Sequence, residues 1–384
     1  MAYQKKNKKT GSQVEQAVSA DVSKSILALK KEFEKDSDIG VKFGSEVKIE
    51  YFSTGILSLD YALNGGVPEG RITEFFGEEQ SGKTLIAMLM IAEMQKKHPE
   101  KAVILADAEQ AFDSHWAKTL GIDTDRLIVM QGTVIETVCD AIASKLDKYP
   151  ISLIVFDSLQ AFVTKRENEL TIEKAVDQYS LLAKAATIAI RKMQGQISKY
   201  NTAIVMISQV RENMEEYGPT WRTGGGKAMK HFGWTRIQVK KPNEKAYLKD
   251  NDIKTGVDME CAIIKHRGLV LAKEATTYFR IWFNNGLDKV YDLVNFMINT
   301  KMITHAGAWF YYKTEAGEDL RWNGMEAVVS DFTNKPEVFE KAYGHAQHYL
   351  DEMRRRIKED EEPTQTQTPE GGTEDENVDP ASKA

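Results

Sequence analysis

A glycine-rich segment, Gly77–Thr84, has the residue types of a phosphate-binding loop. It matches GxxxxGK[ST] without a mismatch and lies between the apolar run Ile72–Phe76 and a helical pattern that begins near Leu85. Glycines let the backbone curl tightly around an anion, so that several N–H groups converge on phosphate oxygens. The Lys83 ammonium can reach the β and γ phosphates, and the Thr84 hydroxyl can ligate Mg²⁺. The pattern predicts ATP and Mg²⁺ as cofactors, held by Gly77, Glu78, Glu79, Gln80, Ser81, Gly82, Lys83, Thr84 and Leu85.

Two further strand-like runs end in acidic residues. Leu153–Phe156 precedes Asp157, and Ala102–Ala106 precedes Asp107 and Glu109. Ligands of open α/β sheets bind at the carboxyl ends of the strands, so we expect Asp157 to be the second Mg²⁺ ligand. Hydrolysis also needs a group that orients the attacking water. Either Asp107 or Glu109 could serve; a helix-capping role for Asp107 would leave Glu109 free, and we favour Glu109 as the base.

The elements that must position these residues alternate between strand-like runs and helical patterns. They follow one another as Ile72–Phe76, Leu85–Gln95, Ala102–Ala106, Ser114–Leu120, Leu127–Met130, Val134–Leu146, Leu153–Phe156, Ala175–Ser198 and Ala203–Ile207. Such alternation predicts an α/β fold with a mostly parallel sheet. From Trp234 to Phe283 shorter runs indicate antiparallel strands that extend the sheet.

Composition excludes several classes of protein. Only Cys139 and Cys261 occur, far apart, which argues against a disulfide framework or a zinc site and favours the reducing cytoplasm. No run approaches the roughly 20 apolar residues of a membrane span, so we expect no membrane partner. Residues 359–384 hold nine acids and one base, although the whole chain has a net charge of only −6. The body is therefore mildly basic, which fits a DNA site for which the tail competes; a solubilising tail is the alternative.

Several motifs in register resemble those of the RecA recombinase family. The similarity runs from about Ile49 to about Leu350, and it is carried by Phe52–Asp60, Gly77–Thr84, Asp107–Glu109, Asp157–Ser158, Ile207–Arg211, Thr223–Gly226 and Gly307–Trp309. The resemblance implies a RecA-like P-loop ATPase core with a mostly parallel central sheet, a small N-terminal helical segment and a small α+β C-terminal domain. Several motifs in the family's order are more specific than any one of them.

The resemblance also divides the chain into four segments. Residues 1–48 would form a basic arm, an oligomerisation helix and a linker, and the apolar spacing of that helix is Val22, Ile26, Leu29 and Phe33. Residues 49–286 would be the ATPase core with its DNA-binding loops, and residues 287–357 the C-terminal domain. Residues 358–384 would be a disordered acidic tail, because their composition cannot bury enough apolar area to fold.

Roles of single residues near the nucleotide follow from the resemblance alone. Glu109 would activate water, and Gln209 would sense the γ-phosphate and relay its presence to the following loop. Asp113 and Trp116 would contact adenine, with Trp where Tyr is usual. Without the resemblance, Gln209 is an ordinary strand-end amide and Trp116 a core aromatic residue.

Two cations, Lys265 and Arg267, match a family pair that reaches the ATP of the neighbouring subunit. Such cations stabilise transition-state charge, so hydrolysis would require assembly. A head-to-tail contact of this kind does not close on itself and generates a helical filament. On composition alone the two residues are ordinary exposed charges at a strand end.

Two loops, Lys165–Asp177 and Glu212–Lys230, resemble the family's DNA-binding loops. The second interleaves glycines, aromatic residues and cations, a mixture suited to stacking on unpaired bases while contacting phosphates; a mobile surface loop is the alternative. We expect the DNA contacts to come from Lys184, Arg191, Lys192, Arg211, Tyr217, Trp221, Arg222, Gly225, Gly226 and Lys230. For Arg191 and Lys192, a solvated helix face is the alternative.

The resemblance implies a DNA-dependent ATPase that forms filaments on single-stranded DNA and exchanges strands with a homologous duplex. Its partners would be single-stranded DNA, homologous double-stranded DNA and further copies of itself, with single-strand-binding and mediator proteins as additional candidates. The alternative is a ring-forming DNA helicase or translocase on the same core, and the segments after Gln209 and at Gly307–Trp309 favour the recombinase. A non-motor binding protein and a small-molecule P-loop kinase explain the motifs less well.

Overall fold

The computed structural model describes residues 11–35, 41–171, 179–212, 221–223, 226–268, 275–314 and 317–359. The chain separates into two compact units, one formed by residues 49–356 and the other by residues 1–48 with 357–384. Within the described ranges, no helix is both long and apolar enough to cross a bilayer. The four-segment division expected from the sequence stays a prediction.

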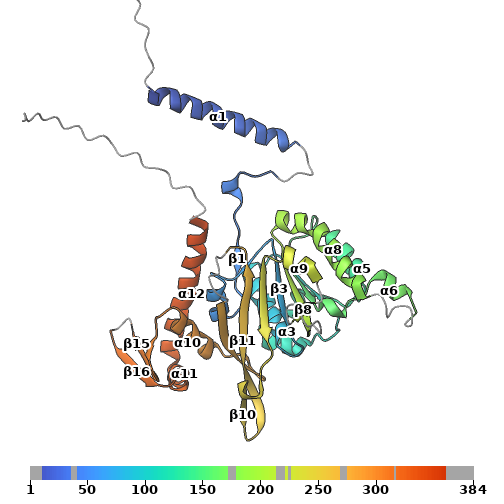
Figure 1. The fold of residues 1–384 in the computed structure, drawn as a ribbon. Helices are drawn as coiled ribbons and strands as arrows, with labels where there is room; N and C mark the ends of the chain where they lie inside the picture. The colour runs from blue at the N-terminus through green and yellow to red at the C-terminus, as the bar shows by residue number, and fades with distance from the viewer. Residues whose placement is uncertain are drawn as a thin grey trace, which may run out of the picture. The chain divides into compact units, whose positions relative to one another are not determined.

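A large mixed sheet runs through the unit of residues 49–356 (Figure 1). The strands β9-β3-β7-β6-β4-β5 pair in parallel, and β11, β12 and β13 continue the sheet in antiparallel pairing. The strand bounds are β3 Ile72–Gly77, β4 Ala102–Asp107, β5 Leu127–Met130, β6 Ile151–Asp157, β7 Ala203–Glu212, β8 Trp221–Thr223, β9 Thr235–Lys240, β10 Tyr247–Asp250, β11 Ile253–His266, β12 Ala275–Trp282 and β13 Gly286–Leu287. The predicted α/β class with a mostly parallel sheet is confirmed. The strand β9 has one neighbour of each kind: it pairs antiparallel with β11, as expected for this region, and in parallel with β3, which was not expected.

Helices cover both faces of this sheet. On one face, Ile86 and Met90 of α3 pack into the cluster that contains Phe75 of β3. On the other face, Ile142 and Ile190 belong to a second cluster, contributed by α5 and α8. The helix bounds in this part are α2 Leu57–Ala62, α3 Lys83–Lys97, α4 Ser114–Thr119, α5 Ile135–Ala143, α6 Lys165–Glu169, α8 Tyr179–Tyr200 and α9 Gly226–Phe232. Successive strand residues point to opposite faces, which is why strands such as Ile151–Asp157 are buried along their whole length.

A smaller third cluster lies at the C-terminal side of the same unit. It joins Phe296, Val328, Phe332 and Ala346. Around it are three helices and a three-stranded antiparallel sheet: α10 Lys289–Asn299, β14 Thr304–Ala306, β15 Trp309–Lys313, β16 Asp319–Asn323, α11 Met325–Asn334 and α12 Pro336–Glu359. The predicted small α+β segment is therefore present.

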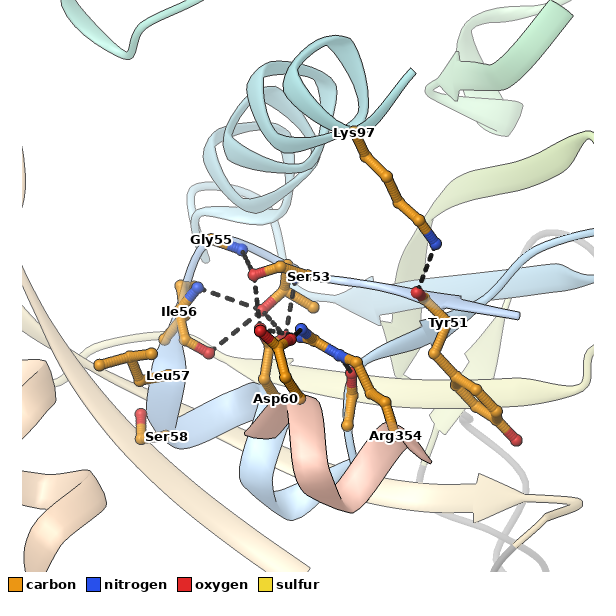
Figure 2. A network of polar contacts seen from close by, with 12 residues as sticks. Tyr51, Ser53, Gly55, Ile56, Leu57, Ser58, Asp60, Lys97 and Arg354 are labelled. Atoms are coloured by element: carbon orange, nitrogen blue, oxygen red, sulfur yellow. Dashed lines mark hydrogen bonds and ion pairs between the residues drawn. The ribbon is translucent and has the colours of Figure 1, made fainter. Parts of the chain in front are cut away.

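The short strand β1, Tyr51–Phe52, pairs with β2, Val67–Pro68. An ion pair joins α12 to the segment that follows β1. Figure 2 shows Arg354 reaching Asp60, with a distance of 3.4 Å from Nη2 to Oδ2. Arg354 Nε also donates to the Gly65 carbonyl at 2.5 Å. The Asp60 carboxylate further accepts hydrogen bonds from Thr54 N and Thr54 Oγ1, each at 2.7 Å. This network fixes α12 against the segment that contains Asp60 and Gly65.

The other unit contains one long helix, α1 Gly11–Phe33. Lys30 on this helix pairs with Glu46 at 2.8 Å and lies 4.4 Å from the centre of the Phe43 ring. The apolar side chains that repeat at helical spacing are about half exposed, and they are Val22, Ile26, Leu29 and Phe33. The predicted amphipathic helix therefore exists, and its apolar stripe is open to solvent in the single chain.

Candidate active site

The glycine-rich loop joins β3 to α3 with the tight curvature that the pattern predicts. Gln80 has a φ of 62° and Gly82 a φ of 87°, so the chain turns through left-handed conformations that favour glycine. A side chain at Gly77 would bring its Cβ within 2.1 Å of the Val239 carbonyl oxygen, which requires glycine there. The loop ends at the N-terminus of α3, whose backbone dipole favours an anion.

The Lys83 ammonium lies inside this loop. It donates to the carbonyl oxygens of Gly77 at 3.1 Å and Glu78 at 2.5 Å, and to Ser81 Oγ at 3.2 Å. Burial lowers the pKa of Lys83, while the nearby carboxylates of Asp157 and Glu109 oppose that shift. Backbone carbonyls therefore hold this cation at the centre of the loop.

Asp157 ends β6 next to the loop. Its side chain is buried and accepts a hydrogen bond from Thr84, so the two predicted Mg²⁺ ligands lie side by side. Burial is the main reason that the pKa of Asp157 rises to about 6; the charge of Glu109 acts in the same direction, and the Thr84 hydrogen bond opposes the rise. A hydroxyl and a carboxylate are hard oxygen ligands of the kind that Mg²⁺ takes, so the residues fit the ion.

Glu109 lies beyond the end of β4 in an exposed position. Ser158 Oγ donates to Glu109 Oε1 at 2.6 Å, and the Gln209 side-chain amide lies 3.4 Å from the same oxygen. The Asp157–Ser158 peptide bond is cis. Asp107, by contrast, is buried and accepts from the backbone N–H groups of Ala111 and Phe112. Asp107 therefore orders the loop before α4 but caps no helix, since the N-cap of α4 is Asp113.

A cleft of about 410 Å³ opens above these residues. Among the predicted site residues its lining includes Glu79, Gln80, Gly82, Lys83, Thr84, Leu85, Glu109, Asp113, Trp116, Asp157 and Gln209. Asp113 caps α4 by accepting from Trp116 N at 2.7 Å. The cleft is also lined by Met88, Leu105, Ala111, Phe112, Ser158 and Ile207, which sequence reasoning did not single out as site residues.

Gln160 is a site residue that no sequence motif points to. Its side-chain oxygen accepts from Gln209 N at 2.9 Å, and its amide donates to the Gln209 carbonyl at 3.1 Å. A glutamine in the turn after β6 carries no motif of its own. Its contact could be found only from the fold.

The two predicted cations, Lys265 and Arg267, are not among the residues that line this cleft. Lys265 on β11 pairs in register with Arg236 on β9, which pairs with Glu74 on β3. The phosphate loop starts at Gly77, three residues further along β3. Lys265 is thus displaced from the loop by about 10 Å along the strands and about 10 Å across them.

The predicted DNA contacts fall partly outside the described residues. Tyr217 and Gly225 lie outside them, and for Arg211, Trp221, Arg222 and Gly226 the backbone is described but the side chains are not. In the antiparallel pair of β7 and β8, position 211 faces position 222. Lys184, Arg191 and Lys230 are exposed, and Lys192 pairs with Asp140 at 2.7 Å.

Comparison with known proteins identifies the family. The family described as the RecA N-terminal domain matches residues 20–288. Several similar curated proteins are named Protein RecA. One from Fusobacterium nucleatum is 35% identical over 322 residues, which cover 83% of this chain and 81% of that protein. One from Thermus aquaticus is 34% identical, and the match covers 82% of this chain and 90% of that protein. One from Aquifex pyrophilus is 32% identical, and the match covers 82% of this chain and 88% of that protein. The chain therefore belongs to the RecA family of DNA recombinases.

Proposed function

We propose that this protein is an ATP-dependent recombinase that assembles as a helical filament on single-stranded DNA and exchanges strands with a homologous duplex. In this reaction ATP and water yield ADP and phosphate, and DNA stimulates the turnover. The observation that carries the proposal is the separation between the phosphate loop and the cations Lys265 and Arg267, since it makes one chain incomplete as an ATPase.

The nucleotide would sit in the cleft with its phosphates on Gly77–Thr84. Lys83 would exchange its carbonyl partners for β- and γ-phosphate oxygens, and the loop's N–H groups would bind the same oxygens. Thr84 and Asp157 would hold Mg²⁺, which neutralises charge on the transferred phosphoryl group. Trp116 and Asp113, which also line the cleft, would contact the adenine ring.

Glu109 would orient the attacking water. Ser158 and Gln209 both approach Glu109 Oε1, which supports this role because they fix the carboxylate's direction and leave its second oxygen for water. Gln209 would sense the γ-phosphate from the same position. It lies on β7, which runs on to Glu212 and into the second loop, so a change at Gln209 reaches the DNA site through one strand.

Lys265 and Arg267 would complete the active site of the adjacent subunit. A lysine side chain spans far less than the combined displacement of Lys265 from its own phosphate loop, so neither cation serves the nucleotide of its own chain. Cations supplied in trans stabilise transition-state charge and make turnover depend on assembly. The exposed apolar stripe of α1 supports the same assembly, because a neighbouring copy would bury it.

DNA would bind at the second loop and at exposed lysines and arginines near it. The pairing of β7 with β8 supports this location of the DNA site. The two ends of the second loop form a short antiparallel ribbon, in which Arg211 faces Arg222. Lys184, Arg191 and Lys230 would add phosphate contacts. Buried free thiols at Cys139 and Cys261 are compatible with the reducing cytoplasm, where we expect the protein to act.

Electron microscopy tests the proposal most directly. The protein would be imaged with single-stranded DNA and a non-hydrolysable ATP analogue, with the ATPase rate measured in parallel with and without DNA. Helical filaments that need both ligands are expected, together with DNA-stimulated turnover. Closed rings would favour the helicase alternative, and a monomer that ignores nucleotide and DNA would overturn the proposal.

A further inference from the structure

The last residues of β11 hold the two proposed trans-acting cations on either side of a buried histidine. Lys265 is half-buried, His266 is only 5% exposed, and Arg267 is exposed. The register between β11 and β9 shifts between Ile263 and Lys265, so an irregularity re-aims the strand immediately before these residues. The inference below rests on the proposed role of the two cations.

The side chains of the two cations converge on one place. Lys265 Nζ donates to the Lys230 carbonyl at 2.7 Å, and the Arg267 guanidinium donates to the carbonyl of the next residue, His231. Both carbonyls belong to the last turn of α9, where helix carbonyls lack partners within the helix. Burial lowers the pKa of Lys265, and the charges of Arg267 and Arg236 lower it further. Two cations brought so close repel each other, so their backbone needs hydrogen bonds that keep it in place.

His266 accepts one of these bonds. Its Nδ1 accepts the Gly268 N–H at 3.1 Å and so closes a turn around Arg267, whose own N–H donates to the Trp234 carbonyl at 3.1 Å. The imidazole lies parallel to the Tyr51 ring at 6.4 Å between centroids. A Cβ at Gly268 would lie 3.1 Å from the Tyr51 hydroxyl and 3.2 Å from His266 Cε1, so the turn fits closely against both rings.

We propose that His266 is a positioning residue for ATP hydrolysis in the adjacent subunit: by accepting the Gly268 N–H it fixes the backbone of Arg267 and aims Lys265 and Arg267 together at the subunit interface. His266 touches neither nucleotide nor water in this scheme. It acts only through the turn that carries the cations.

The property of His266 to be tested is the hydrogen-bond acceptor at Nδ1. Burial lowers the pKa of His266 to about 4, so at neutral pH the ring is uncharged, Nδ1 is an acceptor and the proton sits on Nε2. Nε2 is buried without a hydrogen-bond partner among the described residues, so the acceptor at Nδ1 is the polar atom in use. Phenylalanine would keep the stacking on Tyr51 and lose the acceptor. Asparagine would lose the ring but can accept the N–H two residues on, as in an Asx turn.

The ATPase kinetics of two variants separate positioning from packing. For His266→Phe we expect the DNA-stimulated kcat to fall by about 10- to 100-fold with an unchanged KM for ATP, because a small misplacement of catalytic groups has that effect. His266→Asn should stay within about threefold of the unchanged protein, since it restores the acceptor. His305→Phe, the same change at an exposed histidine of β14, is the matched control. A fully active His266→Phe, or an inactive His266→Asn beside an active His266→Phe, would overturn the inference.

Mixed filaments test whether His266 acts across the interface. A His266→Phe subunit keeps its own Glu109, and a Glu109→Gln subunit keeps its own cations, so joining them rebuilds an intact site. In an equal mixture about a quarter of head-to-tail interfaces have the productive order, and about a quarter of full turnover should return. The Lys265→Ala/Arg267→Ala double variant mixed with Glu109→Gln is the reference pair. Failure of the reference pair would refute the trans-acting cations and the inference with them. Recovery of the reference pair without recovery of the His266→Phe pair would refute the inference alone.

Discussion

The side chain of Gln160 makes two hydrogen bonds to the backbone of Gln209, one to its N–H at 2.9 Å and one to its carbonyl at 3.1 Å. The same Gln209 holds its side-chain amide 3.4 Å from Glu109 Oε1. Gln160 therefore fixes the backbone of a residue on β7, the strand that leads to the second loop, next to the proposed catalytic base. Two neutral hydrogen bonds contribute on the order of 2 kcal/mol to that arrangement.

Replacing Gln160 by leucine should uncouple DNA from hydrolysis. Without its two hydrogen bonds Gln209 spends less time beside Glu109, so we expect the stimulation of ATPase by single-stranded DNA to fall about tenfold. The rate without DNA should change little. Titration of DNA into an ATPase assay measures both quantities. Gln347→Leu, at an exposed glutamine of α12, is the control, and equal stimulation in the two variants would contradict the role given to Gln160.

Site residues could be predicted from the sequence where their contacts lie within one contiguous stretch of the chain. The loop Gly77–Thr84 and the strand-end residue Asp157 were predictable, because the pattern and the flanking elements are contiguous in the chain. The preference for Glu109 over Asp107 also came from local reasoning. The Asp107 carboxylate is engaged by the N–H groups of Ala111 and Phe112 in a loop and not at a helix N-cap, so the role of Glu109 stays a prediction.

Contacts between distant segments left no local signal. Gln160 and Gln209 are 49 residues apart, and Asp60 and Arg354 are 294 apart. The parallel pairing of β9 was missed for a related reason, since a short alternating run does not reveal the direction of its neighbour. The roles of Lys265 and Arg267 came from resemblance alone, and the roles of the individual DNA contacts stay predictions.

Glu109→Gln should separate nucleotide binding from hydrolysis. The amide has the shape of the carboxylate and can still accept from Ser158, so ATP affinity should stay within about twofold. Turnover should drop by about 10²- to 10⁴-fold, because the amide cannot take a proton from water. Equilibrium binding of a fluorescent ATP analogue and steady-state ATPase measure the two effects. Glu93→Gln, on α3, where the Glu93 carboxylate accepts from Lys96, is the control. Loss of nucleotide binding would show that Glu109 holds the loop together instead.

Arg354→Met should destabilise the unit of residues 49–356 far more than a neighbouring change. The Asp60 carboxylate is only 1% exposed, and removal of Arg354 leaves that buried group without its cation. Breaking such a pair costs about 3–5 kcal/mol of unfolding free energy. Arg355→Met, at a side chain that is 62% exposed and bonds Glu352, should cost about 0–1 kcal/mol. Urea unfolding compares them. The double variant Arg354→Met/Asp60→Asn should be more stable than Arg354→Met alone, because it no longer buries an unpaired charge. If the double variant is no more stable, the ion pair is not the source of the loss.

Asp292 should make the stability of the same unit fall as the pH rises toward neutrality. Its carboxylate on α10 is buried and accepts from Leu57 N, Ser58 N and Ser58 Oγ at 2.7, 3.1 and 2.6 Å. Burial raises the pKa of Asp292 from 3.8 to about 7, against the effect of those hydrogen bonds. The folded state therefore binds this proton more tightly than the unfolded state, so its stabilising contribution is complete below about pH 4 and is lost as the pH rises through about 7.

Asp292→Asn does not titrate, so the stability of the unchanged protein relative to this variant should decrease by up to about 1.4 kcal/mol per pH unit between pH 5 and 7. Urea unfolding at several pH values measures the difference, with Asp250→Asn in the exposed β10–β11 hairpin as the control. A difference that stays constant across this range would mean that Asp292 is already charged at pH 5 in the folded protein, with its three donors outweighing the cost of burial.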